Sequence, residues 1–211
     1  MNKTLFAWLS AAINVAAIAR GQGTFQNLDF EAARIILLNN SVVDIATTNA
    51  LPSWTASAGT NQLSIIPYNS FAVFPQVGFY GSNFWVISGT FSVLLRNNGA
   101  ISQTGLVSAD AESLLFKGSW SSLTPLGVSL GGQSLSFTAI SNGPNYTLYG
   151  ADISAFAGQT ATVTFLGPSS SFYFIDDIQF SPQVIPEPSS LALCLTGGIL
   201  AAHRLIRRRK T

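Results

Sequence analysis

Short apolar runs that alternate with polar residues recur between Thr24 and Phe180, with turn residues between them. Successive side chains of a β-strand point to opposite faces of its sheet. In the run 160–166, this places Ala161, Val163 and Phe165 on one face and three threonines on the other. Between the two ends of the chain, no long segment has the 3.6-residue period of an amphipathic helix. The pattern predicts an all-β domain with one buried and one wet face on each sheet.

Eight such runs suit two packed antiparallel sheets, that is, a β-sandwich. Asn98-Gly99 and the segment 142–144 are predicted to be turns, because Asn and Gly tolerate positive φ angles. The Pro- and Gly-broken stretch 67–82 is predicted to be a loop. The expected strands are 63–67, 84–87, 90–96, 111–120, 134–140, 147–152, 160–166 and 172–180.

The N-terminal end has the organisation of a secretory signal peptide. Lys3 precedes an uncharged apolar run from Leu5 to Ala19. This run of about fifteen residues fits a signal peptide and is shorter than the roughly 20 residues of a membrane-spanning helix. Small residues allow cleavage after Ala19 or after Gly21. We expect residues 1–21 to be a helical signal that signal peptidase removes during export.

The C-terminal end carries three elements in series. A linker over 183–188 contains Pro186, Glu187 and Pro188, and its prolines keep the chain extended. The apolar segment 189–206 is expected to form a transmembrane helix. Positive charges after such a helix stay in the cytoplasm, which leaves the main domain outside. The basic tail, residues 207–211, supplies these charges with Arg207, Arg208, Arg209 and Lys210.

These elements resemble the PEP-CTERM sorting signal of Gram-negative bacteria that make extracellular polysaccharide. The resemblance covers Ile185 to Lys210 only. It implies recognition by an exosortase, a membrane cysteine protease that cuts near Pro-Glu-Pro and releases or transfers the mature protein. Removal of a hydrophobic tail that serves as an address is also the logic of GPI attachment. The alternative is a permanent anchor in the inner membrane.

The remaining residues, 22–182, are expected to form one domain, large enough to bury a core. Between Gln22 and Ile185, three basic and eight acidic residues give a net charge of 3 − 8 = −5. An acidic domain without a basic stripe argues against nucleic-acid binding. Cys194 and His203, the one cysteine and the one histidine, both lie in the tail. The domain therefore lacks the residues for a disulfide, a Ser-His-Asp triad, a Cys-His pair or a His-ligated zinc, and we expect no enzyme activity.

Four motifs in the domain look like those of galactose-binding-like jelly rolls, a fold that includes many carbohydrate-binding modules. The resemblance implies an antiparallel jelly-roll β-sandwich. It also implies a structural calcium held by Glu31 and Asp177, with Asp176 as the alternate, completed by backbone carbonyls. Strand alternation sends Asp176 and Asp177 to opposite faces, so only one is expected to join Glu31. The motifs are 27–31, 51–54, 149–158 and 173–180.

Aromatic side chains are the candidates for sugar contacts, because sugar rings stack on flat exposed rings. Trp54 and Trp85 lie in or beside expected strands and are predicted to be core residues. Tyr68 and Tyr80 fall in the expected loop 67–82 and are predicted to face outward as ligand-binding residues. Trp120 and Tyr146 are further candidates.

The sequence thus predicts a non-catalytic protein that is exported to the cell envelope or beyond and binds extracellular polysaccharide after tail processing. A structural surface or adhesion protein that contacts other proteins is the alternative. Glycoside hydrolysis by Glu31 and Asp177 would need a cleft that holds both carboxylates at the right separation.

Overall fold

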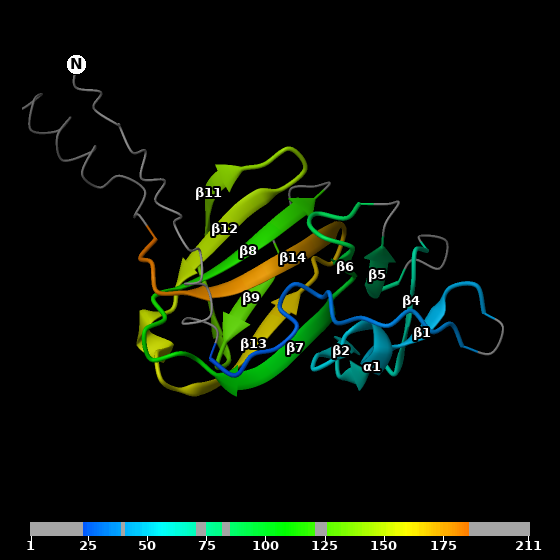
Figure 1. Ribbon diagram of the computed structural model, residues 1–211, viewed down its shortest axis with the longest axis horizontal. Helices are drawn as coiled ribbons and strands as arrows, with labels where there is room; N and C mark the ends of the chain where they lie inside the picture. The colour runs from blue at the N-terminus through cyan, green and yellow to red at the C-terminus, as the bar shows by residue number, and fades with distance from the viewer. Residues whose placement is uncertain (1–22, 39–40, 71–74, 82–84, 121–125, 186–211) are drawn as a thin grey trace, which may run out of the picture.

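Two six-stranded antiparallel sheets pack against each other in the computed structural model (Figure 1), which describes residues 23–38, 41–70, 75–81, 85–120 and 126–185. The first sheet has, in spatial order, β10 (Gln133–Ser134), β9 (Gly127–Leu130), β13 (Thr160–Leu166), β7 (Gly99–Leu106), β2 (Thr55–Ala58) and β3 (Asn61–Gln62). The second has β11 (Thr138–Asn142), β12 (Thr147–Asp152), β8 (Ser113–Trp120), β14 (Phe172–Ser181), β6 (Phe91–Arg96) and β5 (Val77–Gly81).

The chain alternates between the sheets, as expected for a jelly roll. It passes from β6 in the second sheet to β7 in the first, then to β8 and β9, and later through β12, β13 and β14. β14, the last strand, lies between β8 and β6 in the middle of the second sheet. The predicted all-β, antiparallel jelly-roll sandwich is therefore confirmed.

A small two-stranded sheet of β1 (Asp44–Ala46) and β4 (Ile65–Pro67) lies at one side of the sandwich, beside the one-turn helix α1 (Thr47–Ala50) (Figure 1). A 3₁₀ turn, η1 (Ser154–Phe156), connects β12 to β13. Neither of these short helices, the ones found in the described part of the chain, could cross a membrane. The signal and tail helices predicted for 1–21 and 189–206 lie outside the described residues.

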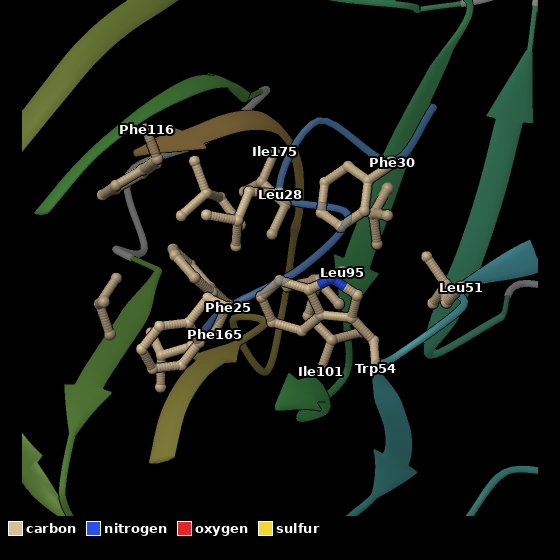
Figure 2. Close-up of a cluster of buried hydrophobic side chains, with 14 of the residues drawn as sticks. Phe25, Leu28, Phe30, Leu51, Trp54, Leu95, Ile101, Phe116, Phe165 and Ile175 are labelled. Atoms are coloured by element: carbon tan, nitrogen blue, oxygen red, sulfur yellow. The ribbon is translucent and has the colours of Figure 1, made fainter. Parts of the chain in front are cut away.

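The core between the sheets is aromatic, and Trp54 lies in it as predicted, with 5% of its surface exposed (Figure 2). Its ring centroid is 5.7 Å from that of Phe30 and 6.5 Å from that of Phe165. The buried indole N–H donates to the carbonyl oxygen of Asn27 at 2.9 Å. This bond matters because an unpaired polar group in such a core is costly. Trp54 thus ties the N-terminal segment to the sandwich.

Strand alternation holds where it was predicted most clearly. In β13, Ala161, Val163 and Phe165 are buried in the core, while the threonines between them point away from it. The turn after β6 lies one residue earlier than predicted, since Asn97 and Asn98 adopt positive φ angles, 48° and 59°, and Gly99 begins β7.

Two local predictions are wrong, and one strand of eight residues was missed. Residues 85–87 of the expected strand 84–87 are irregular, and Trp85 has a φ of +57° that no strand allows. The expected loop 67–82 contains β5, all five residues of which are buried. The strand β7 was not predicted, because its Gly, Ser, Gln and Thr residues dilute the apolar signal.

A bulge in β14 contradicts the expectation that Asp176 and Asp177 face opposite ways. The register with β8 shifts between Asp176 and Gln179, and Asp177 adopts a left-handed φ of +49°. An extra residue in one strand breaks the alternation of side chains. Both carboxylates therefore line one hollow on the surface, which is described below.

Candidate functional site

The outer face of the second sheet holds the charged residues singled out from the sequence. Asp29, Glu31, Ser88, Gly89, Asp176 and Asp177 line a hollow of about 190 Å³. The N-terminal segment brings Glu31 there because it runs along β14, where the Ile178 amide donates to Leu28 at 2.9 Å. Glu31 and Asp177 thus lie at one site, together with Asp176.

Glu31 caps the turn that leads into β6. Its Oε1 accepts hydrogen bonds from the backbone amides of Thr90 at 2.7 Å and Phe91 at 3.0 Å. Gly89, the residue before Thr90, has a φ of +58°, and a Cβ there would collide with the Glu31 carboxylate. Glycine is favoured at this position for both reasons.

Asp176 is buried below the loop 85–91, with 1% of its surface exposed. Its Oδ2 accepts from the Ser92 hydroxyl at 2.7 Å and from the Ser88 amide at 3.1 Å, and its Oδ1 accepts from the Asp177 amide at 2.7 Å. Burial raises the pKa of Asp176 to about 7, although these hydrogen bonds oppose the change.

Lys117, on β8, brings a positive charge to the same hollow. Its Nζ lies 2.8 Å from Asp177 Oδ2, and it donates to Ser88 Oγ at 3.2 Å. The ammonium also lies 4.9 Å from the centroid of the Tyr146 ring. Burial opposes the charge, but the hydrogen bond to Asp177 and the nearby carboxylates outweigh it and raise the pKa of Lys117.

The calcium that the jelly-roll resemblance implies does not fit these residues. Calcium takes six to eight oxygen ligands. Here the Asp177 carboxylate is paired with an ammonium group, and Glu31 Oε1 already accepts from two amides. Within the described ranges, no three His, Cys, Asp or Glu residues form a group able to hold a metal ion. Lys117 is the cation that pairs with Asp177 at this hollow.

Trp85 is exposed on this face, with 56% of its surface accessible. Its ring lies nearly parallel to Phe174, with centroids 5.9 Å apart and planes 9° apart, and meets the edge of Phe172 at 6.4 Å. The prediction that Trp85 belongs to the core is therefore wrong. One face of the indole rests on the sheet and leaves the rest of the ring accessible.

Polar side chains from three other strands or turns hold the loop that carries Trp85. The Ile87 amide donates to Ser92 Oγ at 2.9 Å, and Ser92 in turn donates to Asp176. Asn145, in the turn between β11 and β12, donates from Nδ2 to the Val86 carbonyl at 3.0 Å. Together with Lys117 and Glu31, these contacts fix the loop on the sheet.

A second hollow, of about 310 Å³, lies beside this loop. Uncharged residues of β8 and of the turn between β11 and β12 line it: Gly118, Ser119, Asn142, Gly143, Asn145, Tyr146 and Thr147. The Thr147 hydroxyl donates to Asn142 Oδ1 at 2.9 Å and orients that amide. Tyr146 packs against the buried cluster of Tyr80, Ile87, Leu94 and Phe174 on this outer face.

The two tyrosines predicted to face outward behave differently. Tyr80 is fully buried on β5, and its hydroxyl donates to the Ser70 carbonyl at 2.7 Å. Burial raises the pKa of Tyr80 to about 12. Its prediction as a ligand-binding residue is wrong, because a residue with no exposed surface cannot contact a sugar. Tyr68 is half-buried against Phe79, 6.3 Å away, and its ligand role stays a prediction.

The predicted sorting residues belong to the tail of the chain. Pro186, Glu187 and Pro188, and the arginines at 207–209, lie outside the described residues. Of the further aromatic candidates, Tyr146 lines the second hollow.

Sequence reasoning missed two of the residues that position the Trp85 loop. Lys117 reads as an ordinary polar residue on the wet face of a strand, and Asn145 as part of a turn. The usable signal was Gly89, since a glycine beside an apolar run often marks a backbone with positive φ.

No family model and no curated protein matches this sequence. Among solved structures, the chain is similar to TmCBM61 in complex with β-1,4-galactotriose, at 13% identity and a TM-score of 0.44 over 75% of this chain and 97% of that one. It is also similar to the secreted serine protease VesC from Vibrio cholerae, at 16% identity and a TM-score of 0.31, over 51% of this chain and 25% of that one.

Proposed function

We propose that this protein is an exported, non-catalytic surface or matrix protein whose domain binds polysaccharide at Trp85. The observation that carries the proposal is the exposed indole that lies flat on Phe174. Sugar rings stack their apolar C–H faces on aromatic rings of this kind. The left-handed backbone of Trp85 supports a binding role, because strained residues of this type cluster at functional sites.

The carboxylates of this face are better suited to structure than to hydrolysis. A glycosidase needs an acid and a second carboxylate that both reach the scissile bond. Asp176 has the raised pKa of a general acid, yet it is 1% exposed and hydrogen-bonded to Ser88 and Ser92. Asp177 is paired with Lys117. We therefore favour binding over catalysis.

The ends of the chain supply the proposed route to the cell surface. Signal peptidase removes residues 1–21, and an exosortase recognises Pro186, Glu187 and Pro188. The apolar segment 189–206 and the arginines at 207–209 hold the precursor in the inner membrane until then. The intact mass of the protein from strains with and without the exosortase tests this route. Loss of the tail only in the strain with the enzyme supports it, and an intact tail in both indicates a permanent anchor.

The binding proposal is tested by affinity electrophoresis of the full chain through gels that contain single polysaccharides. We expect Trp85→Ala to abolish retardation, because an exposed aromatic anchor at a binding site contributes about tenfold or more in affinity. Thr162→Ala, on the first sheet, is the matched control and should bind as the wild type does. If every polysaccharide gel that slows the wild type slows Trp85→Ala equally, the role of Trp85 is refuted.

Protein contact, the alternative function, is favoured by one observation. Apolar side chains around β1 and β4 are exposed, with Val42 at 83%. Exposed apolar patches mark protein interaction sites. Self-association that Val42→Ser removes, without any polysaccharide binding, would favour this alternative. The other exposed apolar residues around β1 and β4 are Ile35, Ile36, Leu37 and Ile65.

A further inference from the structure

The uncharged hollow at Tyr146 adjoins the loop that carries Trp85. Asn145 lines this hollow and donates to the carbonyl oxygen of Val86, the residue next to Trp85. Tyr146 packs on the cluster that contains Phe174, the ring under Trp85. A chain that stacks one unit on Trp85 can therefore place a neighbouring unit in the hollow.

Two amide groups of the hollow are oriented before any ligand arrives. Asn142 Oδ1 accepts from the Thr147 hydroxyl, so its amide group remains a donor toward the hollow. Asn145 uses its amide nitrogen on Val86, so its side-chain oxygen remains an acceptor. The hydroxyls of Ser119 and Tyr146 can each donate and accept a hydrogen bond. Paired donors and acceptors of this kind match sugar hydroxyl groups, which also donate and accept.

The charge at the hollow points to an uncharged ligand. Among the described residues, none of those that line the hollow carries a charge. The neighbouring cation, Lys117, is paired with Asp177 at 2.8 Å, which weakens its attraction for a carboxylate or a sulfate. The net charge of −5 between residues 22 and 185 also repels polyanions.

We propose that the hollow at Tyr146 is a second sugar subsite, and that the ligand is a neutral polysaccharide of which at least two units are bound. The inference rests on the proposed function and deepens it. Trp85 provides affinity by stacking, while Asn142, Asn145 and Tyr146 select a unit with correctly placed hydroxyls. The site then prefers a chain to a monosaccharide and neutral sugars to uronates.

The test compares neutral polysaccharides (galactan, xylan, mannan and β-glucan) with two anionic ones (alginate and dextran sulfate) in affinity gels of the full chain. The variants are Trp85→Ala, the double variant Ser119→Ala/Tyr146→Phe, and Thr162→Ala as control. Two lost hydrogen bonds should weaken binding of a neutral polysaccharide by roughly tenfold. Binding of that polysaccharide should change little between 50 and 500 mM salt, and the monosaccharide should compete poorly.

The outcomes separate the inference from the proposed function. If Trp85→Ala loses binding and the double variant matches the wild type, the protein binds sugar but the second subsite is refuted. Stronger, salt-sensitive binding of alginate or dextran sulfate than of every neutral polymer also refutes the neutral ligand. If none of the six polymers retards the wild type, the inference fails together with the polysaccharide binding that it rests on.

Discussion

Asp176 makes the stability of the domain depend on pH in an unusual direction. Its pKa is about 7 in the folded protein, against 3.8 for an exposed aspartate. Between these values the folded chain keeps a proton that the unfolded chain has released, so stability falls as pH rises. Below about pH 4 the contribution of Asp176 to the free energy of unfolding is fully present, and above about pH 7 it is lost.

The size of this effect follows from the two pKa values. Their difference, 7 − 3.8, is roughly 3 units, and at 1.36 kcal/mol per unit this gives roughly 4 kcal/mol. Opening of the loop 85–91 would let water reach the carboxylate and reduce the loss, so we expect about 2–4 kcal/mol. This is a large fraction of the total stability of a single domain.

Urea unfolding from pH 4 to pH 8 measures the effect in the wild type and in Asp176→Asn. The asparagine cannot titrate, so the wild-type curve minus the variant curve isolates Asp176. We expect this difference to decline by about 2–4 kcal/mol between pH 4 and pH 7 and then to level off.

A second variant gives a control of opposite sign. Asp152 accepts from the Ser154 amide, which holds the pKa of that carboxyl below its usual value. The difference between the wild type and Asp152→Asn should therefore rise slightly with pH. A wild-type stability that is flat or rising relative to Asp176→Asn from pH 4 to pH 7 would refute the reasoning about Asp176.

Three further predictions follow from the same contacts. Because Lys117 supplies the cation of the acidic hollow, the melting temperature should be the same in calcium and in EDTA, and a rise of several degrees with calcium would contradict this. Lys117→Gln should speed hydrogen exchange of the amides at 88–91, whereas Arg34→Gln, a charge change outside the hollow, should not. Trp54→Ala should cost about 3–5 kcal/mol in urea unfolding, because it leaves a cavity in the aromatic core, while Trp85→Ala should cost less than about 1.5 kcal/mol.

The sequence predicted the sandwich well because strand alternation is a local signal. β13 follows the period of two, and its buried face is the one expected. The prediction failed where a contact distant in sequence decides the conformation. Trp85 lies outside the core because Asp176 and Asn145, far along the chain, hold its loop on the outer face.

The site shows the same division. The meeting of Glu31 and Asp177 was expected from motif resemblance, and the hollow brings them together. The bulge at Asp177 places Asp176 and Asp177 at the same hollow. This bulge cannot be recognised from the alternation of polar and apolar residues in the sequence. Burial of β5 was hidden for a similar reason, since prolines and glycines that usually break strands stand just before and within it.

The position of β14 has a consequence for the folding of a chain that is exported as proposed above. The last strand fills the centre of the second sheet, and its Asp176 lies 84 and 88 residues after its partners Ser92 and Ser88. Such distant pairings form late, because long loops must close first. A chain that emerges from the membrane N-terminus first cannot complete this sheet until residue 181 is through. The Trp85 loop then gains its contact with Asp176 late, so a truncated or stalled chain lacks the finished surface at which we propose that sugar binds.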